Sequence, residues 1–423
     1  MNEYSKVGLF LVPFLASCSQ GEINSAMSVE VKNSAEGGSG EQIVEISLPT
    51  QYAQWTLKHN ASEWVENSEG RSILLGAVSI TPGSSETLEL VPPEHFSDVD
   101  VQDRAHAELS VRTGGEWQDA AYSADGFTFE DVTSFTSPPQ LTDHSYFLRF
   151  EGPGWESDQI GYRLYLDWRN AIDVFVKTTD SVVLPNVGQD GYDSYHNLSS
   201  WGGDALKVGK SLGVGALGRL VEKEAQVSKK ASSETPSKQT VMHFQHVDNT
   251  HYQMVSNSKL RAEFDVIYQG WSSSEVKADS IDITTRYRID AFDPTTHINV
   301  TVSEPTKNIV AGLVAHDGMQ VIKAEQGEWG VVATWGEQSI LADNDRLGLA
   351  LFYRIDQVEK VFEGEHDHLV LFKPLTTLDY KILAVWPKRI SDVQTAEHFK
   401  AYLVNKLKVY ISPPVVVIKK SDK

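Results

Sequence analysis

Short strand-like segments separated by turns occupy most of this 423-residue chain, and this pattern constrains the fold more than any other feature. Successive side chains of a strand point to opposite faces, so alternating apolar and polar residues predict half-buried strands. Helical spacing is confined to residues 395–408, where Phe399, Leu403 and Leu407 recur. We therefore predict an all-β fold, a large antiparallel, supersandwich-like β-sandwich with one C-terminal helix. The segments expected as its strands are 261–267, 281–289, 298–302, 309–315, 331–335, 347–353, 368–372 and 381–386.

Turn-forming residues and composition divide the chain into four parts. Residues 1–18 contain a short apolar run that ends in Leu-Ala-Ser-Cys, which is typical of a secretory signal and resembles the lipobox of bacterial lipoproteins. Residues 19–41 are rich in Ser, Gly, Asn and Glu and predict a flexible tether. Residues 42–140 are expected to form a smaller N-terminal β-sandwich subdomain, and the Pro138-Pro139 turn marks its boundary with the main domain, 141–423.

The signal sequence and the charge predict where the protein lies and what it contacts. We expect Cys18 to be lipidated and the protein to sit in the bacterial cell envelope, at the outer membrane because no acidic residue directly follows Cys18. The net charge of −21 argues against binding to nucleic acid, and we expect membrane contact only through the lipid anchor. Because Cys18 is the single cysteine, disulfides and thiol catalysis are not expected.

Known catalytic motifs are missing from the sequence, which narrows the chemistry. The chain has no nucleophile elbow, Walker loop or zinc-protease helix. Gly213, Gly215 and Gly218 spell a dinucleotide-binding pattern, but the polar run that follows does not fit a βαβ unit. His243 and His246 are three residues apart and would face opposite sides of a strand, a poor geometry for one metal ion. We expect neither a metal nor another cofactor.

The segment 162–169 alternates apolar residues with Arg163, Tyr165, Asp167 and Arg169. One interpretation is a half-buried strand with a solvated outer face, on which Asp167 pairs with the arginines. The other is a ligand-binding sheet face on which Arg169 binds a carboxylate or a sulfate through its two-pronged guanidinium group. Both interpretations remain open at this point.

A glycine-rich stretch, 188–218, carries further polar and aromatic side chains. A loop tipped by Tyr195 and His196 is a plausible place for proton transfer, although packing with a satisfied hydrogen bond also explains such a pair. His316 follows an expected strand and is the second candidate for a catalytic imidazole. The side chains expected to bind substrate are His144, Arg163, Trp201, Lys207, Lys210, Trp335 and Gln338.

The block FEGPGWESD-x-IGYR-x-YLDWRNAID-x-F, with DGYDSYH and W-G-x-D-x-LKVG-x-SLG, resembles the domain of unknown function 4861 family. The resemblance extends over about residues 42–420 and is most specific within 144–218. It implies a secreted or lipid-anchored, carbohydrate-active β-sandwich protein of a polysaccharide-degrading bacterium. The family includes oligosaccharide dehydratase activity on terminal uronic acids, which yields 4,5-unsaturated ends.

The resulting hypothesis is a hydro-lyase that acts on a uronate at the end of an acidic, possibly sulfated oligosaccharide. Arg169 would bind the carboxylate, His196 or His316 would be the base, and Tyr195 would be the acid. Trp201 and Trp335 would stack on sugar rings, and Lys210 would hold an anionic neighbour. One alternative is a glycoside hydrolase with two carboxylates drawn from Glu151, Glu156, Asp158, Asp193, Asp204 and Glu337. The other is a non-catalytic, glycan-binding lipoprotein.

Overall fold

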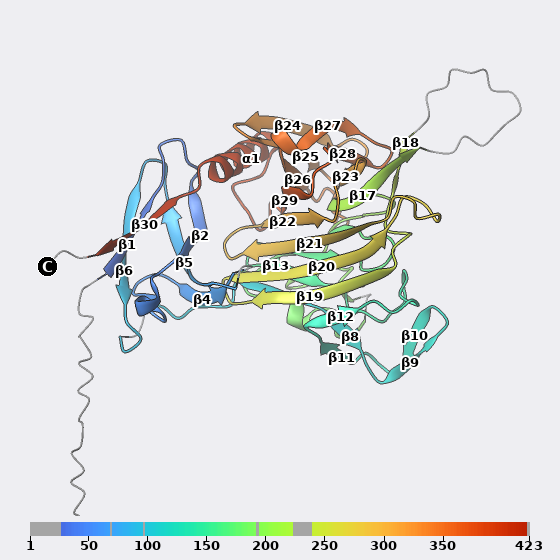
Figure 1. The fold of residues 1–423 in the computed structure, drawn as a ribbon, viewed down its shortest axis with the longest axis horizontal. Coiled ribbons are helices and arrows are strands. Elements are labelled where there is room, and N and C mark those ends of the chain that lie inside the picture. The colour runs from blue at the N-terminus through green and yellow to red at the C-terminus, as the bar shows by residue number, and fades with distance from the viewer. Residues whose placement is uncertain (1–26, 68–69, 96–97, 192–193, 223–238, 421–423) are drawn as a thin grey trace, which may run out of the picture.

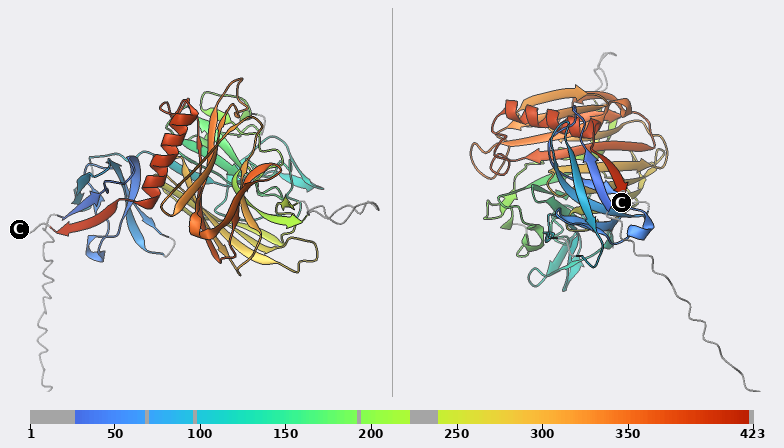
Figure 2. Two further views of the ribbon diagram at one scale, coloured as in Figure 1. Left: turned by 90° about the horizontal axis from the view of Figure 1, so that it is seen from above. Right: turned by 90° about the vertical axis from the view of Figure 1, so that its left-hand side faces the viewer.

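The computed structural model describes residues 27–67, 70–95, 98–191, 194–222 and 239–420, which form two β-sandwiches joined side by side (Figures 1 and 2). One α-helix, α1 (Ala396–Ile411), is present in these ranges. The all-β prediction with a single C-terminal helix is therefore confirmed. The expected signal segment 1–18, with Cys18, lies outside the described residues. Within the described ranges, no helix is both long and apolar enough to cross a membrane.

The smaller sandwich consists of a four-stranded and a three-stranded sheet, in the orders β3-β6-β1-β30 and β2-β5-β4. Buried apolar residues from both sheets, among them Val29, Ile46 and Leu88, form its core. The strands are β1 (Met27–Lys32), β2 (Gly40–Ile46), β3 (Thr56–Leu57), β4 (Ser62–Glu66), β5 (Ser72–Ile80), β6 (Ser85–Val91) and β30 (Val415–Lys420), with a 3-10 turn at η1 (Thr50–Tyr52).

One layer of the main sandwich is a nine-stranded antiparallel sheet in the order β12-β19-β20-β21-β22-β29-β26-β25-β24. The inner face carries apolar side chains such as Phe264, Tyr287 and Ile298, which belong to the main core. The strands are β12 (Ser134–Thr136), β19 (Asn249–Asn257), β20 (Arg261–Trp271), β21 (Ile281–Asp290), β22 (Thr295–Val302), β24 (Gln320–Gln326), β25 (Trp329–Gly336), β26 (Leu347–Arg354) and β29 (Thr377–Val385).

Two five-stranded sheets form the opposite layer, in the orders β16-β15-β14-β13-β7 and β18-β17-β23-β28-β27. A parallel bridge between Ile172 and Gly213 connects them. The strands are β7 (Ala105–Glu108), β13 (Gly154–Ser157), β14 (Ile160–Leu164), β15 (Ile172–Lys177), β16 (Gly202–Asp204), β17 (Val214–Glu222), β18 (Gln239–Met242), β23 (Ile309–Val314), β27 (Val358–Glu363) and β28 (Asp367–Phe372). Outside the two layers lie β8 (Ser110–Arg112), β9 (Gly115–Gln118), β10 (Ala121–Ala124), β11 (Phe129–Asp131) and the 3-10 turns η2 (Leu184–Asn186) and η4 (Ile355–Gln357).

The strands and the helix expected from local patterns agree closely with the structure. Each of the eight expected strand segments of the main domain coincides with a strand, and α1 begins where the helical spacing begins. The Thr395 side chain accepts a hydrogen bond from the His398 backbone N–H, which caps the helix. Phe399, Leu403 and Leu407 pack on the outer face of β24, β25, β26 and β29, where they form a second core.

The domain boundaries differ from the expected ones, because strand pairing joins distant segments. β1 lies within the expected tether 19–41, where Met27, Val29 and Val31 alternate inward and pair with β30. The C-terminal strand β30 therefore belongs to the small sandwich, although it was assigned to 141–423. Conversely, β7 and β12 precede the expected boundary at Pro138-Pro139 but pair within the main sandwich.

Candidate functional site

The outer face of the sheet β16-β15-β14-β13-β7 carries a dense network of charged side chains. Arg163 of β14 donates hydrogen bonds to Asp173 of β15 at 2.8 Å and to Asp204 of β16 at 2.6 Å. It also donates to the phenol oxygens of Tyr165 and Tyr195, both at 3.0 Å. The Tyr165 hydroxyl in turn donates to Asp173 at 2.7 Å. One guanidinium group thus holds two carboxylates and two phenols from three strands and a loop.

The alternation of apolar and polar residues along β14 explains why Arg163 points to the outer face of the sheet. It does not explain why Arg163 is buried there. Tyr162 and Leu164 point inward to the main core, so Arg163 points outward. Another apolar cluster covers that outer face. Its members are Phe150, Phe175, Val183, Leu184, Val187 and Tyr195. Arg163 is consequently only 2% exposed, and its carboxylate partners balance its buried charge.

Arg169 lies at the edge of this network and contacts three carboxylates. It donates to Asp167 at 2.6 Å and to Glu151 at 2.7 Å, and its Nη1 lies 2.7 Å from Asp143. Its guanidinium group also packs on the Tyr165 ring at 4.1 Å. Asp143 is the most exposed of the three acids, so an incoming anion reaches Arg169 most directly by replacing that carboxylate.

His196 and Asp204 form an imidazole–carboxylate pair at the surface of the network. The His196 Nε2 atom lies 3.3 Å from Asp204 Oδ2, and the His196 side chain is 43% exposed whereas Asp204 is 2% exposed. A buried carboxylate bound to one ring nitrogen orients the imidazole and stabilises its protonated form. This geometry leaves Nδ1 as the nitrogen available to a substrate proton.

Several residues around the network adopt a backbone conformation that is rare for side chains other than glycine. The φ angles are 55° at His144, 59° at Tyr146, 62° at Glu151 and 41° at Asn170. Such conformations cost about 1–3 kcal/mol each and persist where surrounding contacts hold them, which is common at functional sites. For Glu151 and His144 the contacts are those of the Glu151 carboxylate, which binds Arg169 and accepts a hydrogen bond from the His144 backbone N–H at 3.3 Å.

Burial and neighbouring charges shift the proton affinities within the network. Burial, reinforced by Asp204, raises the pKa of Asp173 to about 7. Burial also raises the pKa of Tyr195, which favours its protonated phenol. For Glu151, burial is outweighed by Arg163 and Arg169, so its pKa is lowered and the carboxylate stays ionised.

The acidic edge of the network also contains ligand types suitable for a metal ion. Asp143, His144 and Glu151 place one potential ligand atom each within 4.8 Å of one another. Both carboxylates already lie against Arg169, whose positive charge competes with a cation for the same oxygens. The two carboxylates are therefore better suited to hold the guanidinium group than a divalent ion.

The structure brings together four of the expected site residues: Arg163, Arg169, Tyr195 and His196. Their contacts run through Glu151, Asp173 and Asp204. Tyr195, however, is only 1% exposed. Direct proton donation from Tyr195 to a substrate does not fit this burial. His144 lies close by and is 67% exposed.

The remaining expected residues lie outside the network or in the core. His316 hydrogen-bonds through Nε2 to the Lys207 carbonyl at 2.8 Å, separate from the His196–Asp204 pair. Trp201 is half-buried and packs against Phe175. The Lys207 and Lys210 side chains are exposed.

Two residues expected to contact sugar are structural. Trp335 is 5% exposed because it lies beneath helix α1 against Phe399, so it offers no face to a ligand. Gln338 is equally buried, and its amide donates to the backbone carbonyls of Thr334 and Leu347.

Some members of the network carried no recognisable signal in the sequence. Asp173 is followed in β15 by Val174, Phe175 and Val176, and an acid next to such an apolar run could have indicated a paired arginine. Trp168 occupies an apolar position of the alternating segment, yet it is 44% exposed beside Arg169. The strand β14 ends at Leu164, so the alternation no longer predicts its direction.

These features define a large antiparallel β-sandwich protein with an arginine–carboxylate network beside an exposed His–Asp pair. A family model described as "Domain of unknown function (DUF4861)" matches residues 20–417, and the chain belongs to this family. No curated protein matches the sequence.

Two solved structures align with most of the chain at low similarity. An α-mannosidase from Enterococcus faecalis V583 aligns at 8% identity with a TM-score of 0.44, over 94% of this chain and 46% of that one. A glycosyl hydrolase family 38 protein from Enterococcus faecalis aligns at 8% identity with a TM-score of 0.43, over 94% and 47%. The chain thus spans less than half the length of either protein.

Proposed function

We propose that the protein is a carbohydrate-active hydro-lyase that removes water from the non-reducing-end uronic acid of an anionic oligosaccharide. The His196–Asp204 pair is the observation that carries the proposal, since it places an oriented base at the exposed edge of the arginine–carboxylate network. The family resemblance supports the same chemistry, because the family includes dehydratase activity on terminal uronates. The expected product is a 4,5-unsaturated uronate.

The reaction needs a base, stabilisation of the uronate carboxylate, and a proton for the departing hydroxyl. His196 takes the C5 proton through Nδ1, and the C–H electron pair forms the C4–C5 double bond as the C4–O bond breaks. The resulting imidazolium returns its proton to the departing hydroxyl group, which leaves as water. Asp204 stabilises the imidazolium between the two transfers.

Arg169 is the group proposed to hold the uronate carboxylate. The substrate carboxylate replaces Asp143, the most exposed of the acidic partners, at Arg169 Nη1. Asp167 and Glu151 keep the other side of the guanidinium group in place. The bound carboxylate then gains negative charge as the C5 proton leaves, and the fixed cation stabilises that charge most strongly at the transition state.

We assign Tyr195 a role other than that of the catalytic acid expected from the sequence. Its hydroxyl accepts from Arg163 at 3.0 Å, and its ring lies 4.7 Å from the His196 ring. It is therefore proposed as a positioning residue for Arg163 and for the loop that carries His196. The proton for the leaving hydroxyl comes from His196 itself.

The test is incubation with saturated, uronate-capped oligosaccharides, followed by the ultraviolet absorbance of the conjugated double bond. The expected result is an absorbance increase with the wild-type protein and with His316→Gln, and an increase slower by about 10²- to 10⁴-fold with His196→Gln. His316 is the matched control because it is a partly exposed histidine outside the pair. New reducing ends without the chromophore would indicate a glycoside hydrolase, and binding with unchanged substrate would indicate a glycan-binding protein; either result refutes the proposal.

Lipid attachment at Cys18, with an outer-membrane location, is proposed from the sequence. Cys18→Ser should move the protein from the membrane fraction to the soluble fraction of cells that express the full chain. Unchanged fractionation would contradict lipid attachment.

A further inference from the structure

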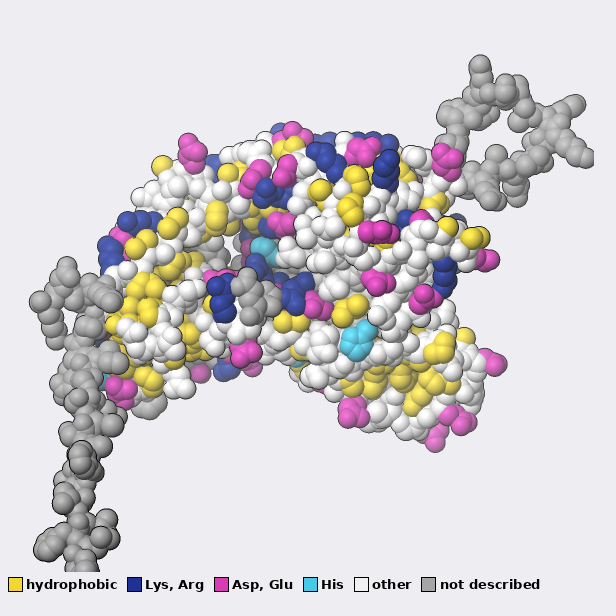
Figure 3. All heavy atoms as spheres, in the orientation of Figure 1, with side chains coloured by type: hydrophobic (Ala, Val, Ile, Leu, Met, Phe, Trp, Pro, Cys, Tyr) yellow, Lys and Arg dark blue, Asp and Glu magenta, His cyan; other side chains and the backbone are white. Residues whose placement is uncertain are grey.

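A charged cavity of about 490 Å³ lies where the small sandwich, the end of α1 and the outer face of the nine-stranded sheet meet. Its walls include β2, Tyr410 and the segment 413–416, opposite side chains of β20, β21, β22 and β29. Figure 3 shows the surface hollowed between the two sandwiches, with basic and acidic side chains gathered around the hollow. The volume falls in the range of roughly 300–1,000 Å³ that is usual for small-molecule sites.

Strand register places four ionisable residues in one row across the floor of this region. Glu263 pairs with Arg288, Arg288 with His297, and His297 with Lys381. Residues paired in this way lie about 5 Å apart on the same face of the sheet. The neighbouring residues Tyr287, Ile298 and Tyr380 point to the opposite, apolar face. Alternation thus gives the four residues a common face, and the register between the strands aligns them in one row.

The cations of the cavity differ in how well carboxylates neutralise them. Arg261 binds Asp290 and Glu45, each at 2.6 Å. Arg288 has no comparable partner, because its nearest carboxylate oxygens belong to Glu45 at 3.6 Å and to Asp290 at 3.8 Å. Its Nε atom is buried without a hydrogen bond.

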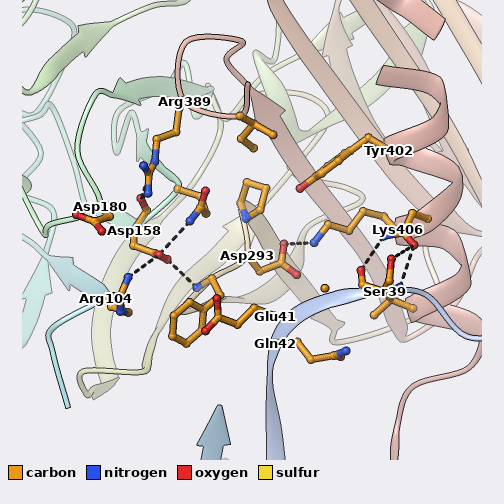
Figure 4. Close-up of a pocket in the computed structure, with 17 residues that line it drawn as sticks. Ser39, Glu41, Gln42, Arg104, Asp158, Asp180, Asp293, Arg389, Tyr402 and Lys406 are labelled. Carbon is orange, nitrogen blue, oxygen red and sulfur yellow. Dashed lines mark hydrogen bonds and ion pairs between the residues drawn. The ribbon is translucent and has the colours of Figure 1, made fainter. Parts of the chain in front are cut away.

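A neighbouring cavity of about 500 Å³ shows the contrasting arrangement (Figure 4). There, Arg104 lies 3.1 Å from Asp158, and Lys406 lies 2.8 Å from Asp293, so each of these cations has a close carboxylate. Asp293 lines both cavities. Arg288 thus differs from Arg104 and Lys406 in having no carboxylate oxygen within hydrogen-bond distance.

Two basic groups beside Arg288 have a reduced affinity for protons. Burial lowers the pKa of His297 well below its usual range, with further lowering by Arg288, Lys381, Arg261 and Lys406. Burial lowers the pKa of Lys381 to about 8, against the opposing effect of Asp379. An anion placed among these groups would relieve their mutual repulsion.

We propose that this cavity is a second binding site, in which Arg288 and Lys381 hold the carboxylate of an acidic sugar unit. The planar fork of Arg288 suits a carboxylate, and the oxygens of Asp290 and Asp379 can accept hydrogen bonds from sugar hydroxyl groups. The site lies on the outer face of the nine-stranded sheet, whereas His196 lies over the opposite layer of the sandwich. It would therefore bind a part of the anionic chain other than the reacting end. The ligand class rests on the proposed function, but the charge argument does not.

The Glu45 carboxylate would compete with a ligand carboxylate for Arg288, and this competition supplies a second variant for the test. Its carboxylate reaches in from β2 of the small sandwich and lies 3.6 Å from Arg288 Nη1, and its side chain is 45% exposed. A ligand carboxylate would meet repulsion from Glu45 and would share Arg288 with it. Neutralising Glu45 should therefore strengthen binding, an effect that a purely structural Arg288 would not produce.

The experiment is calorimetric titration with a glucuronate-terminated disaccharide, performed on proteins that carry both His196→Gln and Arg169→Gln, so that no substrate is turned over and the carboxylate contact of the first site is removed. Arg288→Gln should weaken binding roughly tenfold, since a charge-assisted hydrogen bond is lost, and Glu45→Gln should strengthen it roughly threefold. Arg286→Gln is the matched control, because Arg286 lies on the same strand face but is held by Asp265 at 2.7 Å outside this cavity.

The comparison ligands are a neutral disaccharide and acetate, which separate the sugar from the free anion. Binding only of the acidic disaccharide, with opposite changes in Arg288→Gln and Glu45→Gln, supports the proposal. Equal binding by the background protein with and without Arg288→Gln overturns it, as does binding of acetate with the same affinity. Because turnover is absent throughout, this outcome is independent of whether the protein is a hydro-lyase.

Discussion

The His196–Asp204 pair yields the most demanding prediction, which concerns how two substitutions combine. The atoms lie 3.3 Å apart, and the carboxylate is buried whereas the imidazole is exposed. A hydrogen bond to a charged partner contributes about 1.5–3 kcal/mol, which corresponds to about a 10- to 150-fold change in rate. Asp204→Asn should therefore lower kcat within that range. His196→Gln removes the base itself and should lower kcat by about 10²- to 10⁴-fold.

The double variant distinguishes a functional pair from two separate contributions. If Asp204 acts only through His196, the double variant should be no slower than His196→Gln alone. The assay is the initial rate of absorbance increase with a uronate-capped oligosaccharide, measured alongside thermal unfolding. A double variant that loses the product of the two single factors would refute the pair as a unit.

Asp173→Asn provides the matched control for damage to the charge network. Asp173 binds the same Arg163 at 2.8 Å as Asp204 does at 2.6 Å. Its pKa, raised by burial to about 7, means that it is only partly ionised near neutral pH, so replacement by a neutral amide removes less than a full negative charge. If Asp173→Asn slowed the reaction as much as Asp204→Asn, the loss would come from the network and not from the imidazole pair.

Three further predictions concern the remainder of the structure. Trp335→Ala should destabilise the protein by about 3–5 kcal/mol in chemical denaturation, because the ring is buried beneath α1. Unchanged stability together with weakened saccharide binding would contradict this and would indicate that Trp335 contacts the ligand. Burial raises the pKa of Asp367 to about 7, so the folded state holds a proton that the unfolded chain has lost, and stability should fall by up to about 4 kcal/mol as the pH rises from 4 through 7. Asp367→Asn should reduce this dependence in thermal unfolding at pH 5 and pH 8, and an identical pH dependence would contradict the shift. Chelation with EDTA should leave the rate unchanged, because Arg169 already lies against the Asp143 and Glu151 carboxylates, and a loss of activity that added metal restores would disprove this.

At the candidate site, residue patterns predict the direction of side chains but not their burial. Alternation correctly separates Tyr162 and Leu164 from Arg163, because the direction of a strand side chain is a local property. It cannot tell whether the outer face meets water or protein. Phe150 and Tyr195, contributed by segments on either side of β14, cover that face and bury the guanidinium group.

The cavity between the small sandwich and the nine-stranded sheet also depends on contacts that alternation does not predict. Arg288, His297 and Lys381 lie on three strands whose existence was predictable from their alternation. Their alignment in one row depends on the register between strands, which is decided by packing of the whole sheet. A single sequence carries no direct record of that register.

By itself, the sequence determined the all-β class, the eight strand segments of the main sandwich and the helix that Thr395 caps, since each follows from spacing within a short stretch. Tertiary structure alone decided that β1 and β30, from opposite ends of the chain, share a sheet. It also decided that Trp335 is buried and that the Asp204 carboxylate meets the His196 imidazole. These outcomes depend on contacts between distant segments, whose free energy comes from burying surfaces together and is not encoded in either segment alone.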